Sequence, residues 1–70
     1  MPDSVYKIIE LVGTSPNNFA EAVKNTVETA AKSLEDLRIA EVVKLDVKLD
    51  DNKVVLYRAR VRLSFKYKQE

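Results

Sequence analysis

The apolar residues between Ser15 and Leu34 recur with the period of a helix. They lie three and four positions apart, as the series Phe19, Ala22, Val23, Val27, Ala30, Ala31 and Leu34. This spacing is typical of an amphipathic helix that packs along one face. Pro16 suits the first helical position, and Ser15 suits the N-cap before it. The pattern predicts one helix of about nineteen residues and no second helix.

Three other stretches have the character of strands. Residues 5–12, VYKIIELV, are rich in β-branched and aromatic side chains. From Ile39 the chain alternates with period two, with Val43, Leu45, Val47 and Leu49 on one side. A second alternation runs over 54–67, and its apolar row is Val55, Tyr57, Ala59, Val61, Leu63, Phe65 and Tyr67. The element order is therefore β-α-β-β, an α+β fold class, in a single domain over 1–70.

Gly13 is the only glycine of the chain and follows the first predicted strand. A single glycine at a strand-to-helix turn indicates a backbone conformation that other residues resist. We therefore expect an unusual backbone at this position.

The loop between the two alternating strands decides which side chains share a face. A two-residue loop at 51–52 would set Leu49 opposite Val54, beside the charged row of the next strand. A three-residue loop at 51–53 sets Leu49 opposite Val55, and both apolar rows then share one face. We expect the longer loop, with Asn52 or Lys53 in a left-handed conformation.

The same register predicts two cross-strand pairs of charged residues. It places Asp46 across from Arg58, where the two side chains can form a cross-strand ion pair. It also places Lys44 across from Arg60, where like charges repel unless an anion or a neighbouring acid lies between them.

The predicted lengths do not match. A helix of about nineteen residues spans roughly 28 Å, whereas an unbroken strand over 54–67 spans roughly 46 Å. The sheet would leave Leu63, Phe65 and Tyr67, or the hairpin end, without cover from the helix. Exposed apolar rows of this size mark interfaces, so we expect an obligate homo-oligomer.

Composition narrows the function classes. The 70 residues include no Cys and no His, which excludes disulfides, thiolate or imidazole metal sites and a Ser-His or Cys-His nucleophile. The net charge is +1, which gives no overall electrostatic signal for nucleic acid or membrane. No apolar run is long enough to span a bilayer and no signal peptide is visible, so we expect a cytoplasmic protein.

At this point the residues indicate a family. The opening VYKIIELVGTSP, the single helix, and the later stretches LRIAEVV and VLYRARVRLSF closely resemble the dodecins. The resemblance covers nearly the whole chain. It implies a three-stranded antiparallel sheet wrapped around one helix, twelve copies closed into a hollow shell, and in many members the storage of flavins.

The resemblance also marks the ligand-contacting positions. Flavin-binding dodecins carry a stacking Trp before Ala or Phe and Glu-Val-Val, and a Gln that follows a Tyr in the last strand. Here the matching residues are Ile39, Ala40 and Arg58. An aliphatic side chain loses the aromatic pairing, worth about 0.5–1.5 kcal/mol beyond buried area. These departures resemble the dodecin branch that is associated with calcium.

Each marked residue also has a plainer interpretation. Ile39 can be an ordinary interface aliphatic, and Arg58 a partner of Asp46. The basic row Arg58, Arg60, Arg62 and Lys66 is typical of a solvated or salt-bridged face, because the aromatic residues lie on the opposite side and offer no stacking platform for nucleic acid. Residues 50–52, Asp-Asp-Asn, lack the spacing of a calcium loop and are better interpreted as a turn.

We therefore expect a non-enzymatic homododecamer that binds or stores a small ligand or an ion, with flavin affinity weakened or lost and calcium as the candidate ion. The alternative is a dodecin that still stores riboflavin or FMN. The sequence does not locate the ion site; its oxygen ligands would come from several chains, from among Glu10, Glu21, Glu28, Glu35, Glu41 and Asp50.

Overall fold

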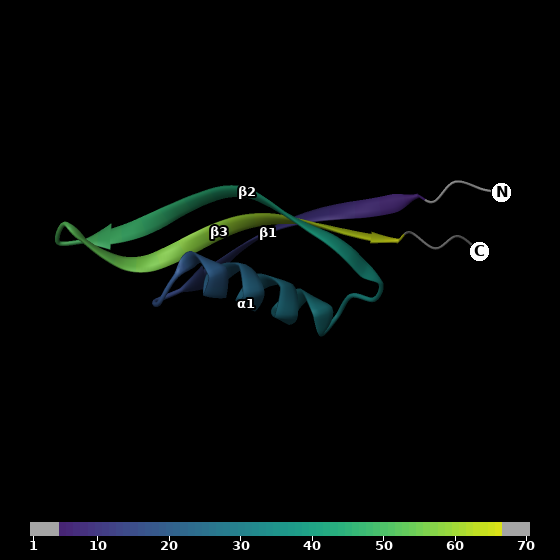
Figure 1. The fold of residues 1–70 in the computed structure, drawn as a ribbon, viewed down its shortest axis with the longest axis horizontal. Helices are drawn as coiled ribbons and strands as arrows, with labels where there is room; N and C mark the ends of the chain where they lie inside the picture. Colours follow the sequence, from purple (N-terminus) through teal and green to yellow (C-terminus); the bar gives the residue numbers. More distant parts are fainter. Residues whose placement is uncertain (1–4, 67–70) are drawn as a thin grey trace.

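The chain folds as a long, curved sheet with one helix beneath it (Figure 1). The structure is a computed structural model, and it describes residues 5–66. The elements are β1 (Tyr6–Ser15), α1 (Phe19–Ala31), β2 (Leu37–Asp50) and β3 (Lys53–Lys66). The sheet order is β1-β3-β2, and both pairings are antiparallel. The predicted β-α-β-β fold with a three-stranded antiparallel sheet is confirmed.

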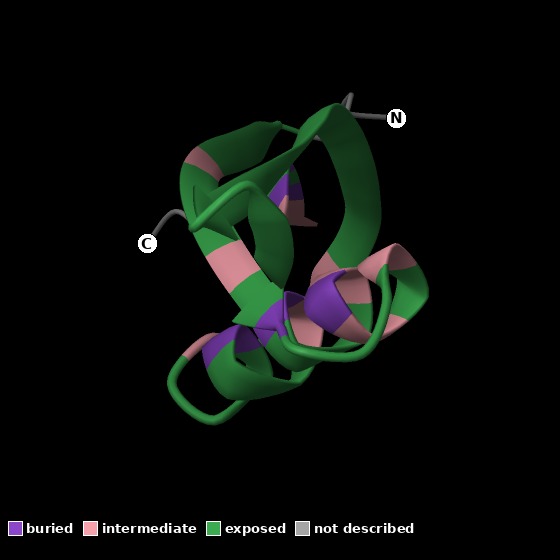
Figure 2. Cartoon of the chain, turned by 90° about the vertical axis from the view of Figure 1, so that its left-hand side faces the viewer, coloured by how far each residue is buried: buried purple, intermediate pink, exposed green. Residues whose placement is uncertain are grey.

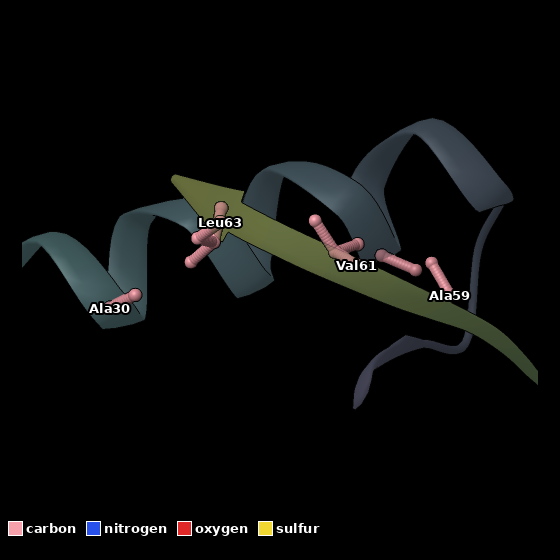
Figure 3. Close-up of a cluster of buried hydrophobic side chains, with 5 residues drawn as sticks. Ala30, Ala59, Val61 and Leu63 are labelled. Atoms are coloured by element: carbon pink, nitrogen blue, oxygen red, sulfur yellow. The ribbon is translucent and has the colours of Figure 1, made fainter. Parts of the chain in front are cut away.

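The core lies between α1 and the middle of β3. Of the described apolar residues, those that are buried are Ala22, Ala30, Ala59, Val61 and Leu63. Figure 3 shows the side chains of Ala59, Val61 and Leu63 pointing from β3 toward the helix. Partly buried residues from β1, α1, β2 and the loop after the helix pack around them, namely Ile9, Val23, Val27, Leu34 and Leu37. The helical and period-two patterns therefore identified this core correctly.

The helix is shorter than predicted at both ends. Its N-cap is Asn18, whose side-chain oxygen accepts a hydrogen bond from the Glu21 N–H at 2.7 Å. Ser15, predicted as the N-cap, is instead the last residue of β1, and its hydroxyl accepts from the Asn17 N–H at 2.9 Å. The serine therefore holds the turn over 16–18, and Pro16 belongs to that turn. At the other end, the helix stops at Ala31, before Leu34.

Gly13 serves a different purpose from the one we predicted. Its backbone has no positive φ, so the expectation of an unusual conformation is wrong. The residue faces α1, and a Cβ atom there would lie 1.6 Å from the Thr26 Oγ1 and 2.9 Å from the Ala22 carbonyl oxygen. Glycine is needed because the helix approaches the strand too closely for any side chain. The strand consequently continues through Gly13 to Ser15.

The hairpin has the shorter of the two loops that we considered, but most of its strand pairs follow the register predicted for the longer loop. The loop has two residues, Asp51 and Asn52, and both have positive φ, 52° and 62°, as a type I′ turn requires. Leu49 pairs with Val54, so the predicted three-residue loop is wrong. A β-bulge at Val55 then shifts the register by one residue. As a result the deeper pairs are the predicted ones, among them Leu45 with Ala59 and Asp46 with Arg58.

The sheet extends well beyond the helix. The molecule measures 55 × 20 × 15 Å, and α1 with its 13 residues covers only about 20 Å of that length. Of the two ends that we considered, the hairpin end is the uncovered one, whereas Leu63 is buried at 1% exposure. Figure 2 shows the buried positions gathered where the helix meets the sheet, with the hairpin exposed. Tyr67 lies outside the described residues.

Candidate functional site

Ile39 lies on the face of the sheet that points away from α1. It pairs with Ser64, the neighbour of the buried Leu63, and so projects to the opposite side from the core. Ser64 also pairs with Ile8 of β1, which places Ile8 and Ile39 on either side of it. Tyr6 lies two residues before Ile8 on β1, and its side chain is therefore on the same face of the sheet. We call Tyr6, Ile8 and Ile39 the outer patch; their exposures are 43%, 59% and 63%.

Sequence reasoning found Ile39 but missed Tyr6 and Ile8. The sequence does predict that Tyr6 and Ile8 share one face of the first strand, because they alternate with period two together with Glu10 and Val12. What was missing was the sheet order β1-β3-β2, which brings β1 and β2 to the two sides of β3. Because the order is not encoded in any local pattern, the flanking residues could not be named.

Ala40 points away from the outer patch. It pairs with Leu63 on the helix side of the sheet. A ligand resting on the outer patch would therefore contact the Ile39 side chain, whereas Ala40 could contribute only through its backbone or through its small size.

Arg58 is held in an ion pair. Its Nε and Nη2 donate to the two carboxylate oxygens of Asp46 at 2.7 and 3.2 Å. This bidentate hydrogen bond lowers the pKa of the Asp46 carboxyl and raises the pKa of the Arg58 guanidinium. The predicted cross-strand pair is confirmed, and two of the guanidinium's donors are already satisfied.

One chain does not bring Ile39 and Arg58 together. Arg58 pairs with Asp46, and Asp46 lies seven positions after Ile39 on β2, which is a separation of roughly 20 Å. Both residues are on the outer face, but a ligand the size of a single ring system cannot touch both in the same copy.

The rest of the outer face is basic and partly neutralised. Lys44 and Arg60 are direct partners, as predicted. The neighbouring acid that we considered is Glu10, whose two oxygens lie 3.4 Å from the Arg60 Nε and 3.6 Å from the Arg62 Nε. On the other face, Tyr57 packs edge-on against Phe19 with ring centroids 5.0 Å apart, so this aromatic ring is engaged in packing.

The carboxylates of one chain do not form a ready cation site. Within residues 5–66, no three Asp or Glu side chains gather closely enough to hold a metal ion. Glu10 is paired, and Glu21 accepts hydrogen bonds from the Ser15 hydroxyl and from the Asn17 amide, which lower the pKa of its carboxyl. Of the six acids that we named, four have no such partner among residues 5–66, namely Glu28, Glu35, Glu41 and Asp50.

Two grooves border the helix. One, of about 350 Å³, lies at the free edge of β1 and is lined by residues of β1 and α1 that include Leu11, Thr14, Asn25 and Thr29. The other, of about 310 Å³, lies at the end of α1 and is lined by Lys7, Leu34, Asp36 and Phe65 among others. Neither groove includes Ile39, Ala40 or Arg58. Among the described residues, no helix is both long and apolar enough to cross a membrane.

Comparison with known proteins gives consistent results. A family model described as Dodecin matches residues 5–68. The calcium dodecin of Mycobacterium tuberculosis is 38% identical over 63 residues, which cover 90% of this chain and 89% of that protein. The crystal structure of that calcium-chelating antigen, described as having a novel calcium-binding site, superimposes with a TM-score of 0.83 at 37% identity over 93% of each chain. The structure of a dodecin from Streptomyces coelicolor superimposes with a TM-score of 0.92 at 30% identity, and covers 100% of both chains.

Proposed function

Because this chain belongs to the dodecin family, we propose that it is a non-enzymatic, cytoplasmic protein that assembles into a hollow homododecamer and stores a small ligand or an ion. Dodecins are binding proteins, and their dodecamers hold small ligands. The observation that carries the proposal is the exposed Ile39 of the outer patch, which stands where the family carries its ligand-stacking residue. Its exposure of 63% in a single copy leaves it open to a ligand or to a neighbouring copy.

Flavin is the weaker candidate ligand. Ile39 provides an apolar contact but no aromatic face, and the loss over two stacking surfaces corresponds to roughly tenfold to a hundredfold in affinity. Arg58 stands where the family has a glutamine that binds the ring edge. Its bidentate bond to Asp46 would have to be shared or broken before it could serve a flavin.

Calcium is the stronger candidate. The curated relative is a calcium dodecin, and calcium takes six to eight oxygen ligands. Since the described part of one chain gathers no group of three acids, we infer that any calcium site is shared between copies. Its carboxylates would come from the four named acids that have no ion pair or side-chain hydrogen bond with another described residue, namely Glu28, Glu35, Glu41 and Asp50.

Storage of riboflavin or FMN is the second candidate function. The observation in its favour is Tyr6, an aromatic residue on the same face as Ile39 but on the other side of β3, where it pairs with Lys66 while Ile39 pairs with Ser64. A flavin could stack on this ring in place of the missing indole.

Three measurements on the purified protein test the proposal. Native mass spectrometry should give a mass twelve times that of the 8.0 kDa chain, and a monomer in dilute buffer would contradict the assembly. Calorimetry should detect heat from the binding of calcium but not from magnesium at the same concentration. The absence of a binding heat at millimolar calcium would exclude the calcium function.

Fluorescence quenching of riboflavin and FMN tests the ligand site. We expect no sub-micromolar binding by the natural protein and a gain of at least tenfold in Ile39→Trp. Val12→Trp is the matched control, because Val12 is an exposed apolar residue on the same face outside the outer patch. Sub-micromolar binding by the natural protein would favour the flavin-storage alternative instead.

A further inference from the structure

The cations in the middle of the outer face are not fully neutralised. Glu10 lies 3.4 Å from the Arg60 Nε and 3.6 Å from the Arg62 Nε, farther than the roughly 2.8 Å of a charge-assisted hydrogen bond. Glu41 pairs with Arg62 across the strands but forms no ion pair with it. Lys44, the direct partner of Arg60, has no ion pair with any residue in the described part of the chain. One loosely held carboxylate therefore serves three cations.

The adjacent pair shows what a neutralised cation looks like on the same face. Arg58 donates to both oxygens of Asp46, at 2.7 and 3.2 Å. The pKa of the Asp46 carboxyl is lowered first by this hydrogen bond, and further by the positive charges of Lys44 and Arg60. The charges of Lys44 and Arg60 therefore act on one part of the surface, where the nearest carboxylate is already engaged with another residue.

A β-bulge sets Lys44 on this face. The register shifts by one residue between Val42 and Lys44, so Val43 is the extra residue of β2. In strict alternation Lys44 would share the helix side with Val42, and the bulge turns it to the outer face instead. The fold thus brings Lys44 face to face with Arg60. Two like charges in direct cross-strand positions destabilise a sheet unless an opposite charge joins them.

The spacing and the chemistry of these cations suit an anion with more than one negative charge. The Cβ atoms of direct cross-strand partners lie about 5 Å apart, and Arg62 projects from the same face about 7 Å farther along β3. Guanidinium groups bind phosphate oxygens in a bidentate manner, and an ammonium group adds a point charge. A carboxylate such as that of Glu10 supplies one negative charge, whereas a phosphate or a diphosphate supplies two or more.

We propose that Lys44 and Arg60, with Arg62 beside them, form a binding site for a small, free anion of the phosphate class. The site is separate from the outer patch, which is apolar. All of its residues come from one copy, so the site does not depend on the proposed shell.

Calorimetry with inorganic pyrophosphate, in calcium-free buffer of low ionic strength, tests this site. We expect the natural protein to bind pyrophosphate at millimolar concentration or below, and Lys44→Gln and Arg60→Gln each to weaken the binding by about fivefold or more. Lys24→Gln is the matched control, because it removes one positive charge from the exposed side of α1. It should change the affinity by less than about twofold. The absence of binding by the natural protein, or an equal loss in the control, would overturn the inference.

Glu10→Gln gives a second test, with an effect in the opposite direction. Its loss frees Arg60 and Arg62 from their shared carboxylate, so the affinity for pyrophosphate should rise by about threefold or more. The side chains of all three residues are between 40% and 49% exposed, and none belongs to the core. An unchanged or weaker affinity in Glu10→Gln would overturn the inference.

Vesicles of phosphatidylglycerol distinguish a free anion from a lipid headgroup. The net charge of +1 gives little attraction to an anionic membrane surface, so we expect the protein not to sediment with the vesicles. Sedimentation with vesicles, without binding of pyrophosphate, would overturn the inference. A natural protein that binds pyrophosphate as a monomer would contradict the proposed shell and leave this site standing.

Discussion

Gly13 sets the distance between α1 and β1. The helix lies so close that the Thr26 side chain and the Ala22 carbonyl occupy the space where a Cβ would be. The Thr26 hydroxyl is itself fixed, because it donates to that carbonyl at 2.8 Å. The position therefore tolerates no side chain unless the helix moves.

We expect Gly13→Ala to destabilise the protein by about 1–3 kcal/mol through overpacking. Thr14→Ala is the matched control, since Thr14 is exposed and its hydrogen bond to Asn25 uses the backbone carbonyl. Urea denaturation of the two variants checks this. Equal stability would show that the helix can shift at little cost.

The carboxylate of Asp46 should make the stability of the protein depend on pH. The pKa of its carboxyl is lowered in the folded protein, chiefly by the hydrogen bond from Arg58. A carboxyl with a lowered folded pKa stabilises the fold above its unfolded pKa, near 4, and this stabilisation is lost as the pH falls through the folded value.

Asp46→Asn should therefore be less stable than the natural protein at pH 7, and the difference should shrink as the pH falls below the unfolded pKa and through the lowered folded pKa of Asp46. Thermal melts across this range measure it. Asp50→Asn, which removes a carboxylate without an ion pair in the described structure, serves as the control. A difference that persists unchanged in acid would show that the loss comes from packing rather than charge.

At the scale of elements, the hairpin turn is the feature most open to improvement. Both Asp51 and Asn52 have positive φ, and the favoured sequence for such a turn has Gly in the second place. We expect Asn52→Gly to stabilise the protein by less than about 1 kcal/mol, because a left-handed backbone costs most L-residues about 1–2 kcal/mol and Asn already avoids part of that cost. Lys53→Gly, placed in the strand, should destabilise it, and chemical denaturation of both separates the turn effect from a general effect of glycine.

The hydrophobic patterns predicted where the strands lie, but they did not predict the β-bulges within them. Alternation located β3, because alternate residues such as Val61 and Leu63 are buried, and it located β2, whose Ala40 and Val42 pair with them. It could not show the bulges at Arg38, Val43 and Val55, since a bulge adds one residue that local sequence does not mark. The helix start was missed for a similar reason: Ser15 and Asn18 are both good caps, and only the continuation of β1 decides between them.

The candidate site was predictable in part. Its residues were identified through family resemblance, and the Asp46–Arg58 pair through register alone. The separation of Ile39 from Arg58 and the presence of Tyr6 beside Ile8 depend on the sheet order, which requires the fold. No pattern in one chain can report whether a second copy contributes residues to the outer patch.

At the scale of the whole molecule, stability should depend on assembly. One copy buries only five apolar residues among those described, too few for a chain of this size to be stable alone. We expect the melting temperature to rise with protein concentration, because association is coupled to folding. Differential scanning fluorimetry over a hundredfold concentration range tests this, and a melting temperature independent of concentration, in a protein shown to dissociate, would contradict it.

The bulges have a consequence for the newly made chain. β2 is a free edge of 14 residues, and a long, flat edge invites other chains to add strands without limit. The interruptions at Arg38 and Val43 break that edge into short pieces, and Lys44 and Lys48 add charge along it. In the proposed assembly, a chain that has not yet met its neighbours would thereby be protected from fibril-like growth and would stay available to the correct partner.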